Sequence, residues 1–271
     1  MPATDPTPEK LAALEAILRA NAPLLIAYSG GVDSTCLLAF ARRTLGDQMR
    51  GVIADSPSLP RQALADALAL AAEIGAPVEV IQTGEMDNPD YASNPLNRCY
   101  FCKADLFKHM DALAQERGFT AIAYGENADD PPQLRPGSQA AREFAVLAPL
   151  RQAGLTKAEV RALSRSLGLP TADAPAQPCL SSRIPYGTPV TREALAMVEA
   201  AEAVVRSLGF RILRVRHIVE PGGNLRAKVQ IAPEEMGRLA ETGMQSLIKA
   251  GVLGVGYGAV EIDPEGYRSM G

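Results

Sequence analysis

Residues 24–167 alternate short apolar segments with segments of helical periodicity, and this alternation constrains the fold more than any other feature of the chain. The apolar segments predict buried strands at residues 24–28, 51–54, 77–81, 120–124 and 146–150. The periodic segments predict helices at residues 33–45, 61–74, 102–117 and 156–167, and residues 84–97 are expected to form a loop. Strands that alternate with helices form a parallel sheet with helices on both faces. We therefore predict an α/β fold with a doubly wound parallel sheet.

Two further regions flank this alternating core. A helix is predicted at residues 9–20, and prolines crowd residues 170–189, which predicts a linker or an active-site loop. The remaining patterns predict a small α+β module, with helices at residues 191–208 and 233–250 and strands at residues 212–219, 227–231 and 252–262. A chain of 271 residues is long enough for about two domains. We place them at residues 1–169 and 190–271, joined by residues 170–189.

The composition argues against several classes of function. Lys and Arg number 27 against 31 Asp and Glu, a net charge of −4, whereas a constitutive nucleic-acid binder needs a cationic excess. A nucleic-acid partner is therefore disfavoured. No apolar stretch reaches the roughly 18–20 residues of a membrane span, and residues 1–6 lack the pattern of a signal peptide. We expect a cytoplasmic protein with no membrane partner.

The segment Ser29-Gly30-Gly31-Val32-Asp33-Ser34 lies where a predicted buried strand passes into a helix. Two glycines allow consecutive N–H groups to form an anion-binding nest at the positive end of that helix, and the two serines add hydroxyl donors. The negative charge of Asp33 would be unexpected beside phosphates unless its carboxylate binds a Mg²⁺ ion that bridges them. The segment lacks the ending of a Walker A loop. The alternative is an ordinary strand-to-helix turn in which Asp33 caps the helix.

This hexapeptide resembles the signature of the PP-loop ATP pyrophosphatases, which cleave ATP between the α- and β-phosphates and adenylate a substrate. The resemblance implies that residues 1–169 form an ATP-binding domain in which Ser29, Gly30, Gly31, Asp33 and Ser34 hold the nucleotide phosphates and Mg²⁺. It also places Asp55, at the end of the second strand, where these proteins receive the adenosine. Asn127 and Asp129 are expected on the nucleotide side of the cleft, or alternatively as caps of the next segment.

Three of the four cysteines form a candidate metal site. Cys99 and Cys102 lie three residues apart near a predicted helix start, and Cys179 lies far downstream. Three thiolates suit a [4Fe–4S] cluster with one iron left open. A structural Zn²⁺ site normally has a fourth Cys or His ligand, for which only His109 and His217 are available. The remaining alternative is a redox pair and one unrelated cysteine. Cys36, in an apolar helical segment, is predicted to be a packed core thiol.

Several motifs together resemble the LarE family across nearly the whole chain. They are the loop at residues 29–34, Asn127-Ala128-Asp129-Asp130, Leu134-Arg135-Pro136-Gly137, Cys179-Leu180-Ser181-Ser182-Arg183, Pro185-Tyr186-Gly187 and Arg214-Val215-Arg216. The resemblance implies a PP-loop sulfur transferase of nickel-pincer nucleotide biosynthesis. Such enzymes adenylate a carboxylate of a pyridinium mononucleotide and convert it to a thiocarboxylate. The sulfur comes either from a sacrificial cysteine or from a [4Fe–4S] cluster that carries an extra sulfide. Cys99, Cys102 and Cys179 resemble the cluster type.

The resemblance also implies a division of roles among the downstream residues. Cys179, Asp33 and Arg183 are expected to be catalytic, with Arg183 bringing charge to a phosphate. Ser182, Arg183, Arg214 and Arg216 are expected to bind substrate, and period-two alternation puts the last two on one strand face. The alternatives are a solvated loop cation and an exposed cationic strand.

The expected partners are a small-molecule nucleotide substrate and either sulfide or a sulfur-donor protein, and the second domain is expected to bind substrate and to mediate a homo-oligomer. The expected cofactors are ATP, Mg²⁺ and a [4Fe–4S] cluster. Two competing functions are compatible with parts of the sequence. A PP-loop tRNA thiolase fits the loop, but the acidic balance argues against it. A degenerate nucleotide-binding regulatory protein is argued against by the intact Asp33 and Ser34.

Overall fold

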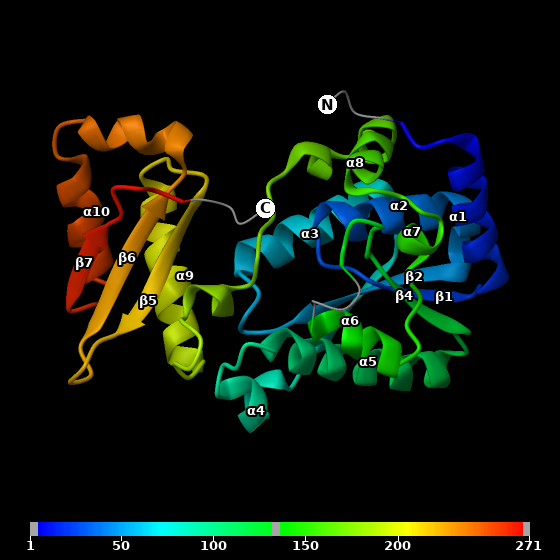
Figure 1. The fold of residues 1–271 in the computed structure, drawn as a ribbon, viewed down its shortest axis with the longest axis horizontal. Coiled ribbons are helices and arrows are strands. Elements are labelled where there is room, and N and C mark those ends of the chain that lie inside the picture. The colour runs from blue at the N-terminus through cyan, green and yellow to red at the C-terminus, as the bar shows by residue number, and fades with distance from the viewer. Residues whose placement is uncertain (1–4, 132–135, 268–271) are drawn as a thin grey trace. The chain divides into compact units, whose positions relative to one another are not determined.

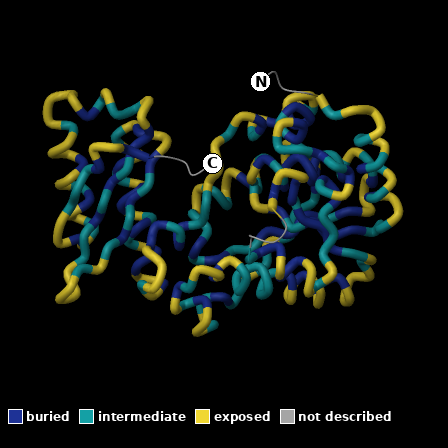
Figure 2. Tube along the Cα trace, in the orientation of Figure 1, coloured by how far each residue is buried: buried dark blue, intermediate teal, exposed yellow. Residues whose placement is uncertain are grey.

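The computed structural model describes residues 5–131 and 136–267, which fall into two compact units. The first unit comprises Met1–Glu85 and Asn97–Gln177, and the second comprises Met86–Leu96 and Pro178–Gly271. The change of unit at Gln177 and Pro178 lies inside the proline-rich residues 170–189. Figure 2 shows that buried residues line the strands and the inner faces of the helices within each unit. Each unit therefore has a core of its own.

The first unit is built on a four-stranded parallel sheet. Its strands are β1 (Leu24–Ala27), β2 (Met49–Asp55), β3 (Val78–Gln82) and β4 (Ala121–Tyr124). The spatial order is β3-β2-β1-β4, so the chain continues on one side of β1 and later returns to its other side. In open parallel sheets, ligands bind beyond the carboxyl ends of the strands at such a reversal. The loop that leaves β1 starts at this point.

Helices cover both faces of this sheet (Figure 1). Because side chains alternate along a strand, Leu24 and Ile26 enter one core cluster while Leu25, between them, enters another. The first cluster includes residues of α1 (Pro8–Ala20), α2 (Val32–Leu45), α3 (Arg61–Ile74), α7 (Pro149–Gln152) and α8 (Lys157–Ser166). The second includes residues of α5 (Arg98–Arg117) and α6 (Pro136–Glu143). The predicted α/β fold with a doubly wound parallel sheet is confirmed.

Three local predictions for residues 84–150 are wrong. The strand expected at residues 146–150 is reduced to a single bridge between Leu147 and Ala123, because Pro149 starts α7 and proline suits the first helical turn. α5 begins at Arg98 rather than residue 102, so both of its cysteines lie inside the helix. The loop expected at residues 84–97 contains the 3₁₀ helix η2 (Glu85–Asp87) and the helix α4 (Pro89–Ala92). Two further 3₁₀ helices are η1 (Gly46–Gln48) and η3 (Pro170–Asp173).

The second unit contains a three-stranded sheet in the order β5-β6-β7. β5 (Leu213–Val219) and β6 (Leu225–Ile231) pair antiparallel, and β7 (Ala259–Ile262) pairs parallel to β6. Residues of α9 (Arg192–Ser207) and α10 (Met244–Leu253) pack with Val215 and Val229 in one core cluster. Period-two alternation therefore leaves Arg214 and Arg216 on the other face of the sheet.

Segments outside this sheet complete the second unit. The 3₁₀ helix η4 (Leu180–Arg183) follows Cys179. The buried Asn94 side chain donates to the carbonyls of Pro185 (2.8 Å) and Thr188 (2.9 Å), which ties Met86–Leu96 to this unit. The helix expected at residues 233–250 is instead η5 (Pro233–Ala240) followed by α10, with a break at Gly243, whose φ is +81°. α10 extends to Leu253, so the strand expected from residue 252 starts only at Ala259.

Candidate functional site

The loop from Ser29 to Ser34 connects β1 to the first turn of α2. Ser34 organises it, because the Ser34 hydroxyl accepts the Ser29 N–H (3.2 Å) and donates to the Gly31 carbonyl (3.1 Å). Gly30 has a φ of +73°, and a Cβ atom there would lie 2.9 Å from the Cβ of Ala67 in α3. Only glycine meets both conditions without displacing α3. The loop is therefore a glycine-dependent backbone cradle, as an anion nest requires.

Asp33 stands at the first turn of α2 with two partners from distant parts of the first unit. Its carboxylate accepts the Asn127 side-chain amide (3.3 Å) and pairs with the Lys157 ammonium (2.6 Å). The structure thus brings the predicted residues Asp33 and Asn127 together. Lys157 was missed by the sequence analysis, although a lysine at the first position of a helix is at odds with the helix dipole and was a signal.

Asp129 has a local structural role beside this group. Its carboxylate accepts the backbone N–H of Lys157 at 2.8 Å, and its own N–H donates to the side-chain oxygen of Asn127 at 3.0 Å. Thr156 and Glu159 add a capping box to the same helix start. Asp129 therefore shapes the segment that carries Lys157. The motif residues Leu134 and Arg135 lie outside the described residues.

Asp55 ends β2 at the carboxyl edge of the same sheet. The Arg61 guanidinium pairs with its carboxylate, and the Gln82 side-chain amide donates to it at 2.9 Å. The hydrogen bond from Arg61, and then that from Gln82, lower the pKa of Asp55. A carboxylate held ionised at this edge is an acceptor for hydroxyl groups of a ligand.

The cysteines divide between the two units. Cys99 is exposed and Cys102 is partly exposed, both in the first two turns of α5, while Cys179 is partly exposed in the second unit. Cys36 is buried in the first core, and burial raises the pKa of its thiol to about 12, so it is an inert core residue as predicted. Over residues 5–131 and 136–267, no three His, Cys, Asp or Glu side chains are grouped to hold a metal ion.

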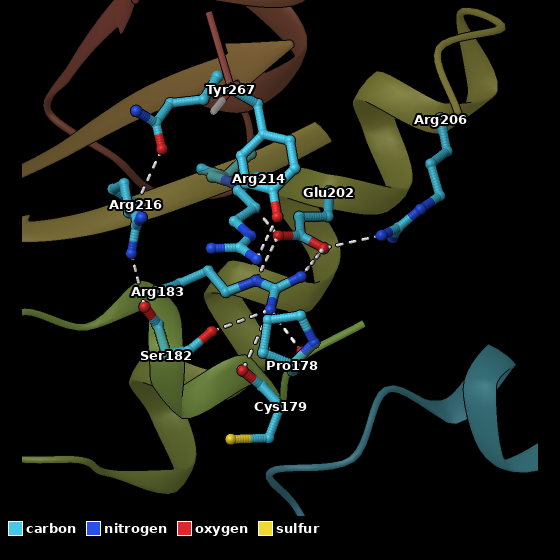
Figure 3. Close-up of polar contacts among 11 residues, drawn as sticks. Pro178, Cys179, Ser182, Arg183, Glu202, Arg206, Arg214, Arg216 and Tyr267 are labelled. Carbon is cyan, nitrogen blue, oxygen red and sulfur yellow. Dashed lines mark hydrogen bonds and ion pairs between the residues drawn. The ribbon is translucent and has the colours of Figure 1, made fainter. Parts of the chain in front are cut away.

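Arg183 is buried in the second unit, and its guanidinium donates hydrogen bonds to other groups of the same chain (Figure 3). Its Nε and Nη2 donate to the carboxylate of Glu202 at 2.8 and 3.3 Å. Its Nη1 donates to the backbone carbonyls of Pro178 (2.6 Å) and Cys179 (3.1 Å) and contacts the Ser182 hydroxyl at 3.1 Å. The Cys179 carbonyl faces the guanidinium while its Sγ points away. Arg183 therefore fixes the backbone that carries the Cys179 thiol.

Glu202 is the anchor of this arrangement, and the sequence analysis missed it. Its side chain has no exposed surface and also receives Arg206 (2.8 Å) and the Val215 N–H (3.2 Å). A buried carboxylate needs such pairing to remain charged. The signal was present, because Glu202 follows Leu195 and Val198 on the apolar stripe of α9 at helical spacing.

Arg214 and Arg216 add positive charge beside this anchor. The Arg216 guanidinium donates to the Ser182 carbonyl (2.6 Å) and the Gln230 side chain (2.9 Å), while Arg214 contacts the Tyr267 hydroxyl and ring. Desolvation lowers the pKa of both arginines, and repulsion from Arg183 lowers it further. Within the described part of the chain, neither has an ion pair with a carboxylate. The nearby Glu202 carboxylate raises the pKa of both without pairing with either directly. Two partly buried guanidiniums that no carboxylate contacts directly favour an anionic ligand.

None of the helices in the described ranges is both long and apolar enough to cross a membrane.

No family model matches the chain. An uncharacterized protein of Synechocystis sp. is 43% identical over 245 residues, which cover 90% of each chain. The glutamine-hydrolysing GMP synthase of Thermomicrobium roseum is 31% identical over 209 residues, which cover 68% of this chain but only 39% of that enzyme, and this likeness supports the PP-loop fold. The pyridinium-3,5-bisthiocarboxylic acid mononucleotide synthase of Lactiplantibacillus plantarum is 31% identical over 261 residues, 96% of this chain and 92% of the synthase. On that identity and coverage, the chain belongs to the LarE family of pyridinium-3,5-bisthiocarboxylic acid mononucleotide synthases.

Proposed function

We propose that this protein is an ATP-dependent sulfur transferase that converts a carboxylate of a pyridinium mononucleotide to a thiocarboxylate in nickel-pincer nucleotide biosynthesis. The observation that carries the proposal is the loop at residues 29–34. It combines a glycine-dependent cradle with a carboxylate, at the strand reversal where parallel sheets bind ligands. Membership of the LarE family supports the choice of substrate.

The residues of the loop fit Mg·ATP. A Cβ at Gly30 would press on Ala67 of α3 at 2.9 Å, and a Cβ at Gly125 would come within 2.6 Å of the Ser34 nitrogen, so both positions of the backbone at this loop require glycine. Ser29, Gly30, Gly31 and Ser34 would hold the phosphates, and Asp33 has the carboxylate chemistry that Mg²⁺ prefers. When bound, Mg²⁺ neutralises charge on the phosphates. Asp55, Asn127 and Asp129 are proposed at the nucleoside side.

In the adenylation step, the protein acts by orienting the two reactants rather than by forming a covalent bond with either of them. The substrate carboxylate attacks the α-phosphorus of ATP, and pyrophosphate leaves from the cradle. The N–H groups and hydroxyls of the loop stabilise the charge that develops on the phosphates. The positive face formed by Arg214 and Arg216, with Ser182 and Arg183 beside it, is proposed to bind the mononucleotide phosphate.

Sulfur transfer is assigned to the cysteines. We propose that Cys99, Cys102 and Cys179 hold a [4Fe–4S] cluster that supplies a sulfide, and the partial exposure of Cys102 and Cys179 and the exposure of Cys99 are consistent with ligand thiols. The alternative is that Cys179 gives up its own sulfur. In both routes Arg183 positions the Cys179 backbone. In the cluster route the sulfur comes ultimately from sulfide or a donor protein, whereas in the sacrificial route it is the sulfur atom of Cys179, which is left as dehydroalanine. AMP is the second leaving group in both.

The test uses the full chain, purified anaerobically and supplied with Mg·ATP, pyridinium-3,5-biscarboxylic acid mononucleotide and sulfide. We expect thiocarboxylate, AMP and pyrophosphate in equal amounts, and no pyrophosphate from Asp33→Asn. The cluster route predicts about four irons per chain and loss of both iron and activity in Cys99→Ala, Cys102→Ala or Cys179→Ala. Dehydroalanine at position 179 after one turnover, with Cys99→Ala still active, would establish the sacrificial route instead. Homo-oligomer formation also stays a prediction, which light scattering measures.

A further inference from the structure

Tyr186 is an aromatic residue that the fold leaves outside its cores. It is 58% exposed, whereas every other tyrosine and phenylalanine in residues 5–131 and 136–267 is buried or only partly exposed. The chain has no tryptophan. Tyr186 is therefore the most accessible aromatic ring in the described part of the chain, and an exposed ring is a ready stacking surface for another ring.

An ordered turn carries this ring. The Thr188 N–H donates to the Pro185 carbonyl (3.0 Å), and Gly187 has a φ of +80°, as the third residue of a type II turn requires. The Gly187 N–H donates to the carbonyl of Asn94 (3.0 Å), which lies on a different segment of the second unit. The backbone that carries Tyr186 is therefore fixed from within the turn and from outside it.

Asn94 is the residue that holds this turn. It is completely buried, and its side-chain amide donates to the carbonyls of Pro185 (2.8 Å) and Thr188 (2.9 Å). Its φ is +57°, a left-handed conformation that is uncommon for residues other than glycine. Residues held in such conformations cost free energy and cluster at functional sites. A buried asparagine in this conformation that fixes the turn of an exposed tyrosine indicates a function for the tyrosine.

A second exposed apolar side chain lies on the segment that is bonded to the turn. Leu96 follows Asn94 by two residues and is 77% exposed. Leu96 and Tyr186 are the two most exposed large hydrophobic residues in the described ranges, and their segments are hydrogen-bonded to each other within the second unit. Exposed apolar groups that gather in this way mark binding sites.

The turn also lies close along the chain to the two arginines that are proposed to bind the substrate phosphate. Tyr186 follows Ser182 by four residues, and the Ser182 carbonyl accepts the Arg216 guanidinium at 2.6 Å. Four residues span at most about 14 Å when fully extended. The phosphate, ribose and ring of a mononucleotide, together with the length of a tyrosine side chain, cover a separation of this order. One ligand can therefore reach both Arg216 and Tyr186.

We propose that Tyr186 is a substrate-binding residue whose ring stacks on the pyridinium ring of the mononucleotide and selects this charged ring over a neutral one. The inference rests on the proposed function, because it takes the mononucleotide to be the ligand of Arg214 and Arg216. The pyridinium ring is electron-poor and carries a formal positive charge, and the face of a tyrosine ring attracts such a charge. The arginines attract the phosphate and repel the charged ring, so Tyr186 supplies the contact that the other end of the substrate needs.

Fluorescence of Tyr186→Trp tests the contact directly, because the chain has no other tryptophan. Titration of the full chain with pyridinium-3,5-biscarboxylic acid mononucleotide should quench the indole emission to saturation, since a pyridinium ring quenches an indole on which it stacks. Ribose 5-phosphate, which lacks the ring, should not quench it. Leu247→Trp is the matched control, because Leu247 is 56% exposed in the same unit. It lies on α10, which packs on the face of the sheet opposite Arg214 and Arg216, and it should show no saturable quenching.

Calorimetric titration then measures what the ring contributes. Tyr186→Leu is expected to weaken binding of the pyridinium mononucleotide about 5- to 30-fold, the range of a cation–π contact. Tyr186→Phe should bind within about twofold of the wild type, because the face of the ring and not the hydroxyl makes the contact. The 1,4-dihydro form of the same mononucleotide has a neutral ring, and Tyr186→Leu should change its affinity less than about twofold.

The outcomes separate this inference from the proposed function. Equal affinity of Tyr186→Leu and the wild type for the pyridinium mononucleotide, or an equal loss for the dihydro form, would overturn the inference and leave the proposed function standing. Saturable binding without quenching in Tyr186→Trp would do the same. If the wild-type chain binds no pyridinium mononucleotide, the inference and the proposed function both fail. Circular dichroism of each variant checks that the fold is intact.

Discussion

At the scale of single residues, Arg183 shows how a side chain can matter to chemistry through the backbone it holds. The sequence suggested a loop cation that meets a phosphate, and that contact stays a prediction. The structure adds that Arg183 is buried against Glu202 and donates to the carbonyls of Pro178 and Cys179. The position of the Cys179 thiol is therefore tied to a buried ion pair.

Replacing Arg183 should be far more costly than replacing Arg206, although both bind the same carboxylate. Arg183→Met leaves Glu202 buried and short of a partner, and we expect a loss of about 3 kcal/mol in the free energy of unfolding. Arg206 is 41% exposed, so Arg206→Met should cost about 1 kcal/mol or less. Urea unfolding of the two variants measures the difference. Equal losses would show that Arg183 is not the structural partner of Glu202.

Substrate affinity should separate Arg214 and Arg216 from the nucleotide residues. Alanine at either position is expected to raise the KM for the pyridinium substrate about tenfold or more, as for a lost charged hydrogen bond, with a smaller change in the KM for ATP. Steady-state kinetics with each substrate varied in turn gives both values. A selective loss of ATP affinity would show that the two arginines bind ATP rather than the pyridinium substrate, and would contradict this prediction.

At the scale of elements, the strand-to-helix junction between β1 and α2 depends on two separate properties of Gly30. Gly75, the C-cap of α3, shares the positive φ (+71° against +73°) but has no atom within 4 Å of a built Cβ. Gly75→Ala should therefore cost only the backbone strain, about 1–2 kcal/mol. Gly30→Ala adds a clash with Ala67 and should also abolish binding of the non-cleavable analogue α,β-methylene-ATP. Wild-type affinity in Gly30→Ala would show that the cradle is not the phosphate site.

The elements also show what local sequence can and cannot predict. Strands β1 to β4 were predicted because each is a short apolar run, and Gly75 and Gly118 mark two helix ends. The sequence missed α7 and the early start of α5, since Pro149 and Asn97 suit loops and helix starts alike. The contact of Lys157 with Asp33 could not be predicted, because a pair 124 residues apart is set by how α8 packs on α2. Glu202 could have been found from its place on an apolar stripe.

At the scale of the whole molecule, His217 should make stability depend on pH. It is buried in β5 beside the Tyr257 hydroxyl (3.1 Å), and desolvation lowers its pKa from 6.5. The unfolded chain therefore takes up this proton first, so stability should fall as pH drops below about 6.5, by up to about 1.4 kcal/mol per pH unit. Above that pH, His217 is neutral in both the folded and the unfolded chain, so it adds no further pH dependence to the free energy of unfolding. Urea unfolding at pH values on both sides should show a smaller decline in His217→Gln, and an identical decline would contradict the assignment.

The bond that the substrate carboxylate forms with ATP can be followed directly with oxygen isotopes. If the carboxylate attacks the α-phosphorus and sulfur later expels AMP, one carboxylate oxygen must leave on the phosphate of AMP. We therefore predict that a substrate labelled with ¹⁸O in its carboxylates yields AMP carrying one ¹⁸O for each thiocarboxylate formed, as measured by mass spectrometry. Unlabelled AMP formed together with thiocarboxylate would contradict adenylation of the substrate and with it the proposed function.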